Sequence, residues 1–477
     1  MSYLASLDRV RRSALYLFAA GALLRLIFAT SRSLWFDEAN TLAVAAAPLA
    51  DLPRLVRTLE GFPPLHYLLL HLWLPLWADP LVGLRMFSVT CGLGALAAFW
   101  PLSRRLAPGQ EHFALGLAAL SSFWIHTAQD GRVYALFLLL GLAACSLLWD
   151  LAERWSLGKA AAYAAVSTAG MYSHNFFLLL LLANAGWLIL RHRKTPARLL
   201  PWLAMFGLIA LLYLPWLASL LTQVRNWSAI SALAVPLSLS QLLYLLGSMI
   251  LDTGFLGFAH EGATRVIGGA VLTSALGLIT WRRSSRPDQA RMGFCLVHIL
   301  APLAAAKLME IMLGKPVTQT RYLICVSPFL YLWLAWAAGR ISGRWGRALR
   351  AGLLGLLLLG AAAYHASGRI LDTRLSALAE AIRRGSSNRA PVIHMDAYYY
   401  TPLRYYYLPE RAHYLLAPGN KNLNWPALPG YPAAPGPAAI GRMGDCVAVD
   451  PWRKFSRGRL ILGTGAQLQG LAGPQQP

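Results

Sequence analysis

The sequence predicts an all-α polytopic membrane protein with juxtamembrane helices in its outer loops and a small C-terminal α/β domain. Of its 477 residues, 57% are hydrophobic and 13% are charged, whereas soluble proteins contain about 25% charged residues. Several apolar runs approach the roughly 20 residues that a helix needs to cross a bilayer. Beyond residue 366, short apolar stretches alternate with turns rich in proline and glycine, a pattern typical of strands. We therefore expect a transmembrane domain, 1–366, and a C-terminal domain, 367–477.

The chain carries a formal net charge of +23, which either a nucleic-acid partner or a membrane topology could explain. Its basic residues lie between the apolar runs, and cytoplasmic loops of membrane proteins carry an excess of Lys and Arg. The charge is therefore attributed to topology, and no nucleic-acid partner is expected. With the basic clusters in the cytoplasm, the chain has about eleven membrane-spanning helices. Their predicted bounds are 13–30, 84–102, 112–127, 134–150, 159–173, 176–190, 199–221, 264–281, 291–312, 322–339 and 350–366.

Two further apolar runs are predicted not to cross the membrane, because each crossing would move the next arginine cluster to the outer side. The run 63–77 begins with Pro63-Pro64 and is expected to be a juxtamembrane or re-entrant helix. The run 236–258 is expected to be an interfacial or re-entrant helix in a later outer loop. The first apolar run is expected to be a retained helix rather than a signal peptide, because Arg25 interrupts it.

The same topology collects mixed polar residues at outer helix ends and in outer loops, while the inner loops hold repeated basic residues. Ionisable residues at a membrane boundary are costly and indicate function. This accumulation on one side predicts an active site facing the extracytoplasmic space, where the C-terminal domain is also expected. The residues placed there are Asp37, Glu38, His66, Asp130, Arg132, His174, Asn175, Lys315, Arg321 and Tyr322.

The adjacent carboxylates Asp37 and Glu38 are the best candidates for catalysis. A structural interpretation makes Asp37 the N-cap of a helix over 39–47. The functional interpretation makes it a general base, because a carboxylate near hydrocarbon has a raised proton affinity. Adjacent carboxylates could also hold a divalent ion. A metal site built from His66, Glu38 and Asp130 has no recognised ligand spacing, so the need for a metal ion is left open and no other cofactor is expected.

Cationic residues near the outer ends predict a phosphate site. Asp130 and Arg132, followed by Tyr134, could form an interfacial ion pair beside an aromatic belt. Alternatively, Asp130 is a second catalytic carboxylate, and the planar fork of Arg132 binds a phosphate. Arg321 could be a snorkelling arginine, or it could form, with the nearby Lys315 and Tyr322, a cationic site for a lipid phosphate.

Histidines and tyrosine rows complete the candidate residues. His66 and His174 lie in apolar surroundings, where a buried core histidine is as good an interpretation as a substrate ligand. The rows Tyr398–Tyr400 and Tyr405–Tyr407 are typical of a surface that docks on a membrane face, and aromatic rows also suit sugars or a polyprenyl chain.

The ordered motifs resemble a known family. LWFDEA resembles the acidic motif of a first outer loop, PPLHYLLL with the following Leu84–Ser88 resembles a PPL…R-x-x-S stretch, and HTAQDGRVYAL resembles a second outer motif. Ala169–His174 and the stretch from Lys315 through Tyr322 to Pro328 match later parts. Over most of residues 10–340, the chain is similar to the polyprenyl-phosphate-sugar-dependent glycosyltransferases of the glycosyltransferase C superfamily. It looks closest to bacterial relatives of protein O-mannosyltransferases and lipid A aminoarabinose transferases.

The resemblance implies a multi-pass enzyme of the bacterial inner membrane whose transmembrane domain, 1–366, is catalytic. It would move a hexosyl or pentosyl group from a polyprenyl-phosphate donor to a lipid, glycan or protein acceptor at the extracytoplasmic face. Asp37 would be the general base, and Arg and Lys side chains would bind the donor phosphate. The QDGR sequence departs from the family's REAR-like run, so Asp130 is shifted relative to the pattern.

A membrane transporter or lipid flippase is the alternative class. Transporters are commonly built from inverted repeats with ionisable residues near the bilayer midplane. No internal repeat is visible here, and most ionisable residues gather at one face, with Arg25 and Lys307 as exceptions. The sequence therefore favours the enzyme.

Overall fold

The computed structural model describes residues 2–59, 62–225, 236–251, 275, 277–278, 280–281, 284–367, 375–387, 390–394, 402–415, 445–450 and 459–464. The chain divides into two compact units. Unit 1 comprises Met1–Ala29, Phe62–His66 and Arg85–Ser367, and unit 2 comprises Thr30–Gly61, Tyr67–Leu84 and Gly368–Pro477. The functional division of the chain at residue 366 stays a prediction.

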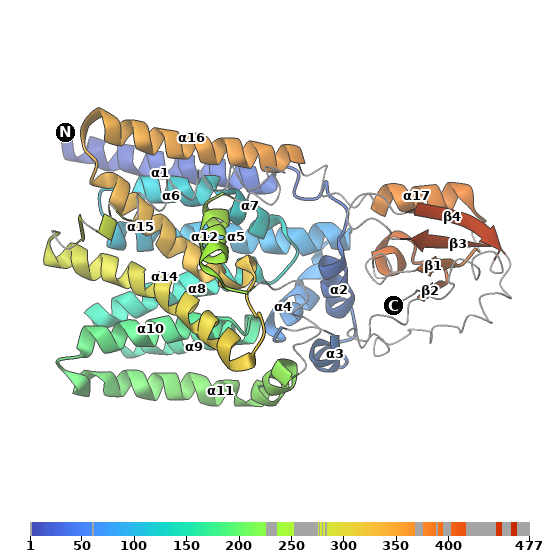
Figure 1. The fold of residues 1–477 in the computed structure, drawn as a ribbon, viewed down its shortest axis with the longest axis horizontal. Coiled ribbons are helices and arrows are strands. Elements are labelled where there is room, and N and C mark those ends of the chain that lie inside the picture. The colour runs from blue at the N-terminus through green and yellow to red at the C-terminus, as the bar shows by residue number, and fades with distance from the viewer. Residues whose placement is uncertain are drawn as a thin grey trace. The chain divides into compact units, whose positions relative to one another are not determined.

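Unit 1 is built from helices that run mostly along a common direction (Figure 1). Six helices of the described chain are long and apolar enough to cross a membrane: Pro80–Leu106, Tyr134–Glu153, Pro196–Val224, Arg286–Leu313, Thr320–Gly339 and Gly343–Ala366. The helices associated with this unit are α1 (Ser2–Leu26), α5 (Pro80–Leu106), α6 (Glu111–Leu120), α7 (Ser122–Gln129), α8 (Tyr134–Glu153), α9 (Leu157–Ser173), α10 (Phe177–His192), η2 (Pro196–Leu199), α11 (Leu200–Arg225), α12 (Leu239–Ile250), α14 (Arg286–Leu313), η6 (Thr320–Val326), α15 (Ser327–Gly339) and α16 (Gly343–Ser367).

Each predicted span that the structure describes overlaps one or two helices, although the bounds differ and residues 27–30 of the span 13–30 form a turn. Most of 264–281 lies outside the described residues, so the number of crossings stays a prediction. The run 63–77 forms the short helices α4 (Leu65–Trp73) and η1 (Leu74–Leu76) directly after Pro63-Pro64. The described part of the run 236–258 holds α12, which is also shorter than a membrane span.

The predicted helix over 112–127 is broken at Ser121, which is a correction to the prediction of one continuous span. Ser121 has an extended backbone (φ −60°, ψ 119°) and caps α7 by accepting a hydrogen bond from the N–H of Trp124. The break leaves carbonyls at the end of α6 without helical partners. The fully buried guanidinium of Arg25 donates to the carbonyls of Ala118 (3.1 Å) and Ala119 (3.0 Å). Arg25 therefore stabilises the break.

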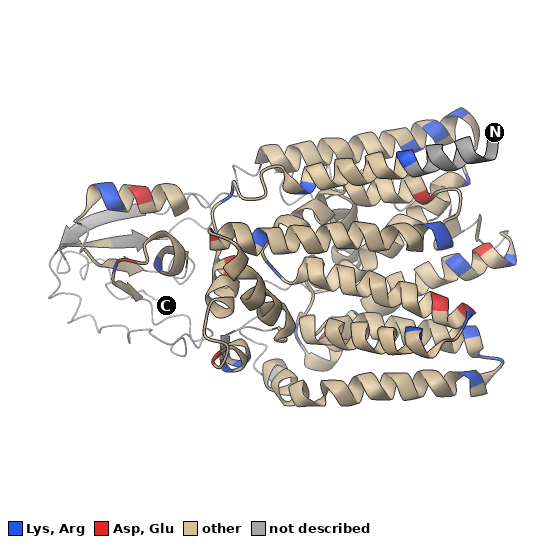
Figure 2. Ribbon diagram, turned by 180° about the vertical axis from the view of Figure 1, so that it is seen from behind, with Lys and Arg blue, Asp and Glu red and all other residues tan. Residues whose placement is uncertain are grey.

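Basic residues gather at one end of the helices of unit 1 (Figure 2). The carboxylate of Asp150 near the end of α8 pairs with Arg105 at the end of α5 (3.1 Å) and with Lys159 at the start of α9 (3.3 Å). We call this the basic end. The arrangement agrees with the charge pattern that the topology prediction uses, while the side of the membrane that this end faces stays a prediction.

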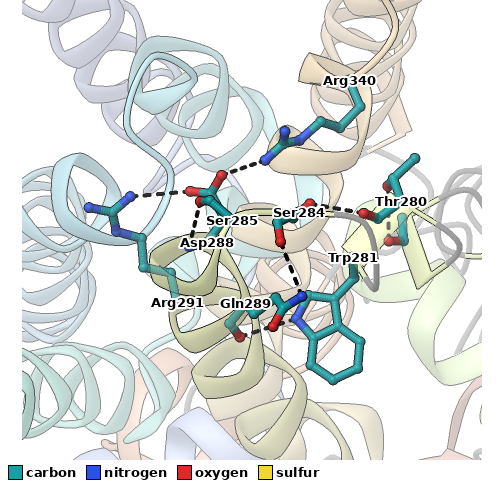
Figure 3. A network of polar contacts seen from close by, with 9 residues as sticks. Thr280, Trp281, Ser284, Ser285, Asp288, Gln289, Arg291 and Arg340 are labelled. Carbon is teal, nitrogen blue, oxygen red and sulfur yellow. Dashed lines mark hydrogen bonds and ion pairs between the residues drawn. The ribbon is translucent and has the colours of Figure 1, made fainter.

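A second carboxylate at the basic end, that of Asp288, is the centre of a network of polar contacts that joins α14 to α15, which we call the Asp288 hub (Figure 3). Asp288 pairs with Arg340 (2.8 Å) and Arg291 (3.2 Å), and its main-chain N–H donates to the capping hydroxyl of Ser285. The indole of Trp281 donates to the carbonyl of Gln289 (3.1 Å) in the same network. These contacts fix the start of α14.

Unit 2 combines short helices with a four-stranded sheet. The sheet order is β2-β1-β3-β4; β1 pairs in parallel with β2 and β3, and β3 pairs antiparallel with β4. Apolar residues of α17, β1, β3 and η7 form one core. For the whole of 367–477 the α/β fold stays a prediction. The C-terminal elements are α17 (Leu375–Gly385), β1 (Val392–His394), η7 (Leu403–Tyr407), β2 (His413–Leu415), β3 (Asp445–Asp450) and β4 (Arg459–Thr464), and the earlier helices are α2 (Phe36–Ala45) and α3 (Leu52–Leu59).

Candidate functional site

An aromatic shell surrounds His174 in unit 1, at the end of α9. The side chain is fully buried, and its ring stacks on Phe137 with a centroid distance of 5.0 Å and an angle of 20°. α9 starts at the basic end and α8 finishes there, so the shell lies at the opposite end of these helices. The other rings of the shell, with centroid distances from His174, are Phe62 (4.7 Å), Tyr322 (5.6 Å), Tyr134 (5.7 Å) and Phe176 (5.8 Å).

The hydrogen bonds of His174 define its tautomer. The main-chain N–H of Phe176 donates to Nδ1 (3.1 Å), so the neutral ring carries its proton on Nε2. Burial, and then the nearby charges of Arg132 and Arg321, lower the pKa of His174 to about 3. Among the described residues, Nε2 has no hydrogen-bond partner. An unsatisfied buried donor costs free energy, so the Nε2–H of His174 is available to a hydrogen-bond acceptor.

Two guanidinium groups lie against the same aromatic shell. Arg132 lies over the ring of Phe62 at 5.3 Å. Arg321 lies over the rings of Tyr134 (5.5 Å) and Tyr322 (5.7 Å), and its Nε donates to Oε1 of Gln319 (2.8 Å). Guanidinium groups bind phosphate oxygens with planar, charge-assisted hydrogen bonds. The shell can therefore receive an anionic group.

The segment that holds Arg132 is fixed by its neighbours. The side-chain amide of Gln129 donates to carbonyls at the end of α1, including Ile27 (2.8 Å), and accepts a hydrogen bond from the hydroxyl of Tyr364 (3.0 Å). The hydroxyl of Ser88 donates to the carbonyl of Arg132 (3.4 Å). Arg132 lies two residues before Tyr134, the first residue of α8, where a helix carries positive partial charge. The fixed position of Arg132 and the positive partial charge at the start of α8 both favour the binding of an anion here.

The remaining candidates of unit 1 have different surroundings. His66 is buried with its ring edge-to-face against Phe87 (5.6 Å), and burial, assisted by Arg132, lowers the pKa of His66 to about 3. Asp130 is buried at the C-terminal end of α7. No contact among the described residues joins the ammonium of Lys315 to the aromatic shell. Lys315 follows Gly314, whose left-handed backbone (φ 64°) ends α14.

Asp37 and Glu38 lie in unit 2, in the first turn of α2. The N-cap of α2 is Trp35, so the interpretation of Asp37 as the N-cap is wrong. Carboxylates in a first turn interact favourably with the helix dipole. Glu38 is buried and Asp37 is half-buried, while Thr41 donates to the main-chain carbonyl of Asp37 (2.9 Å). The assignment of Asp37 as a base stays a prediction.

The described residues do not define a metal site. Within the described ranges, no group of three or more His, Cys, Asp or Glu side chains could hold a metal ion. Whether a divalent ion takes part stays open.

Sequence reasoning missed the phenylalanines of the shell. Phe62, Phe137 and Phe176 lie in apolar surroundings where nothing distinguishes them from core residues. Phe62 directly precedes Pro63-Pro64 and Phe176 follows His174 by two positions, so proximity to the motifs was the only available signal. The row Tyr398–Tyr400 lies outside the described residues, and Tyr405–Tyr407 forms part of η7 in unit 2.

Solved structures share this fold, although comparisons of the sequence with family models and curated proteins find no match. No protein-family model matches the chain, and no curated protein matches it significantly. The crystal structure of ArnT from Cupriavidus metallidurans in the apo state aligns with a TM-score of 0.61 and 14% identity, over 97% of this chain and 99% of that chain. The structure of the same protein bound to undecaprenyl phosphate aligns with a TM-score of 0.61 and 13% identity, with the same coverage. The resemblance that the motifs predict is confirmed at the level of the fold, which this chain shares with ArnT over nearly its full length.

Proposed function

We propose that the protein is an integral membrane glycosyltransferase that uses a sugar linked to a polyprenyl phosphate. The observation that carries this proposal is the buried Nε2–H of His174, held beside Arg132 and Arg321 within one aromatic shell. A hydrogen-bond donor and two guanidinium groups match the oxygens of a phosphate. The shared fold with ArnT, one structure of which is bound to undecaprenyl phosphate, supports the same ligand class.

The reaction exchanges one bond to the anomeric carbon of the sugar for another. Asp37 takes the proton of the acceptor hydroxyl or amine, the acceptor atom forms its bond to the anomeric carbon, and the bond to the phosphate oxygen breaks with inversion. Negative charge grows on the phosphate as it leaves. Arg132 and Arg321 stabilise that charge, which is commonly the largest electrostatic contribution to such a step.

The chemistry of the leaving group explains the neutral histidine. A phosphate monoester has a second pKa of about 6, so at neutral pH it leaves without needing a proton. The low pKa of His174 suits a hydrogen-bond donor rather than a general acid. Tyr134 and Tyr322 orient the guanidinium of Arg321 through their rings.

The other roles follow from charge and position. Lys315 adds positive charge near the donor phosphate, and His66 supports the segment around Arg132. Glu38 orients the loop of Asp37, and Asp130 is an auxiliary carboxylate. The acceptor is a lipid, glycan or protein at the extracytoplasmic face of a bacterial inner membrane, with the C-terminal domain on the same side.

The test compares two lipids that differ only in the phosphate. The purified full chain in lipid nanodiscs is incubated with undecaprenyl phosphate or undecaprenol, and binding is followed by native mass spectrometry. We expect strong preference for the phosphate; equal binding of the two lipids would overturn the phosphate site. Incubation with polyprenyl-phosphate sugars and envelope lipids then measures transfer. Donor binding with no transfer to any lipid, glycan or peptide acceptor would favour the transporter or flippase.

A further inference from the structure

The tyrosines of η7 contact the stretch that leads into α2. The main-chain N–H of Leu34 donates to the hydroxyl oxygen of Tyr407 (2.7 Å), and the Leu34 side chain is fully buried. Leu34 precedes Asp37 by three positions. Helix α2 itself packs against η7. A C-terminal residue therefore holds the backbone directly before the first turn of α2.

Two further contacts join the C-terminal segment to earlier parts of unit 2. The hydroxyl of Tyr406 donates to the carboxylate of Asp79, at 3.0 Å and 3.2 Å from its two oxygens. The hydroxyls of Ser33 and Ser376 lie 3.5 Å apart. The C-terminal segment thus contacts the stretch both before α2 and before α5.

The helix η7 is itself held firmly. Nε2 of His413 donates to the carbonyl of Leu408 (2.9 Å), and the N–H of Leu408 donates to the carbonyl of Leu403 (2.6 Å). The guanidinium of Arg383 donates to the carbonyl of Tyr407. Leu403 and Leu408 are buried in the core shared with α17 and the sheet. The hydroxyl of Tyr407 is therefore a fixed point for the backbone of Leu34.

Helix α2 needs such a fixed point. Its N-cap, Trp35, makes no side-chain capping hydrogen bond, so capping chemistry does not fix where the helix begins. The first turn carries Asp37 and Glu38, and a displacement of about 1 Å at a catalytic group can cost about a hundredfold in rate. A hydrogen bond to the preceding backbone limits that displacement.

We infer that Tyr407 is a positioning residue for Asp37, and that the C-terminal segment serves the reaction by fixing the start of α2. The inference rests on the proposed role of Asp37 as the base. It gives Tyr407, the last residue of the row Tyr405–Tyr407, a role inside the protein.

The test compares Tyr407→Phe with the matched variant Tyr406→Phe, each of which loses one hydroxyl and keeps the ring. Loss of one hydrogen bond at Leu34 should lower kcat about threefold to tenfold. The KM for the donor and the melting temperature should stay at the wild-type values. Tyr406→Phe should keep the wild-type kcat, and hydrogen exchange of the peptide that contains Leu34 should accelerate only in Tyr407→Phe.

A double variant separates this inference from the proposed function. If Tyr407 acts through Asp37, adding Tyr407→Phe to Asp37→Asn should lower the residual rate no further. A wild-type rate in Tyr407→Phe together with a large loss in Asp37→Asn would overturn the inference and leave the proposed function standing. A wild-type rate in Asp37→Asn would overturn both. Equal losses in Tyr407→Phe and Tyr406→Phe would assign the effect to general packing and overturn the specific role of Tyr407.

Discussion

The basic end of unit 1 and the opposite end, which holds the aromatic shell around His174 and which we call the aromatic end, place cationic side chains in different surroundings. At the basic end, Arg105, Lys159 and Arg340 pair with Asp150 or Asp288, which offsets part of the positive charge locally. At the aromatic end, Arg132 and Arg321 lie over rings beside a neutral histidine. Ion pairs at a partly exposed surface contribute little to stability, whereas guanidinium groups over aromatic rings are held by cation–π attraction. Under the proposed function, the basic end serves as an anchor and the aromatic end binds the phosphate of the donor.

The largest expected effect is all-or-none and concerns which end faces the cytoplasm. In a variant with its native cysteines replaced, Arg193→Cys places a thiol beyond α10 at the basic end, and Ser240→Cys places one in α12. The main-chain N–H of Leu237, just before α12, donates to the carboxylate of Glu310 near the C-terminal end of α14. Because α14 starts at the basic end, α12 begins at the aromatic end. An impermeant maleimide added to spheroplasts should label Ser240→Cys alone. Labelling of Arg193→Cys in sealed cells would invert the topology.

The next effect in size concerns the base. Asp37→Asn is isosteric and cannot take a proton, so turnover should fall by about 10² or more. Binding of undecaprenyl phosphate and detergent stability should be nearly unchanged. Glu38→Gln should cost less if Glu38 only orients the loop, as proposed, and as much if the two carboxylates share a metal ion or the acceptor. A steady-state rate within about twofold of wild type would remove Asp37 from catalysis.

The comparison of the two ends is tested most directly by matched arginine variants. Arg321→Ala should weaken donor binding by about tenfold to a hundredfold, the scale of one charge-assisted hydrogen bond. Arg321→Lys should recover part of the affinity, since a point charge replaces a planar fork. Arg340→Ala removes a guanidinium at the basic end and should leave the Kd unchanged. Equal losses in Arg321→Ala and Arg340→Ala would mean that only the total charge matters.

The sequence predicts the helices and the polar motifs better than it predicts the site. Apolar runs of membrane length and the spacing of arginines locate the helices, because both follow from the cost of placing charge in hydrocarbon. Arg132, His174 and Arg321 are found because polar residues stand out in an apolar chain. The shell around them includes three phenylalanines whose role depends on tertiary packing. The break at Ser121 also depends on tertiary packing, because Arg25 supplies the missing partners.

A smaller effect is expected for the neutral histidine. His174→Phe keeps a ring to stack on Phe137 and removes the Nε2–H donor, so donor affinity should fall by about threefold to tenfold. Since the folded-state pKa of about 3 lies below the unfolded value of 6.5, the imidazole stays neutral from pH 5 to 8. The loss in His174→Phe should therefore be equal at pH 5.5 and pH 8 when measured by titration of a polyprenyl-phosphate sugar, whose phosphodiester, unlike a phosphate monoester, keeps the same charge over this range. A loss that grows at pH 5.5 would show that a protonated imidazole contributes.

The smallest effect is expected at the basic end, from Asp288→Asn. The substitution removes the charge that pairs with Arg340 and Arg291 but keeps the main-chain N–H that donates to Ser285, so the cap of α14 survives. The side chains of this hub are partly exposed, and such pairs contribute about 0.2–1 kcal/mol to the free energy of unfolding. Thermal unfolding in detergent should therefore shift by at most a few degrees, and the shift should shrink in high salt because exposed charges are screened. The donor Kd should equal that of wild type. A change in donor binding from this distant hub would mean that the two ends are coupled, and the separation of anchoring from ligand binding would fail.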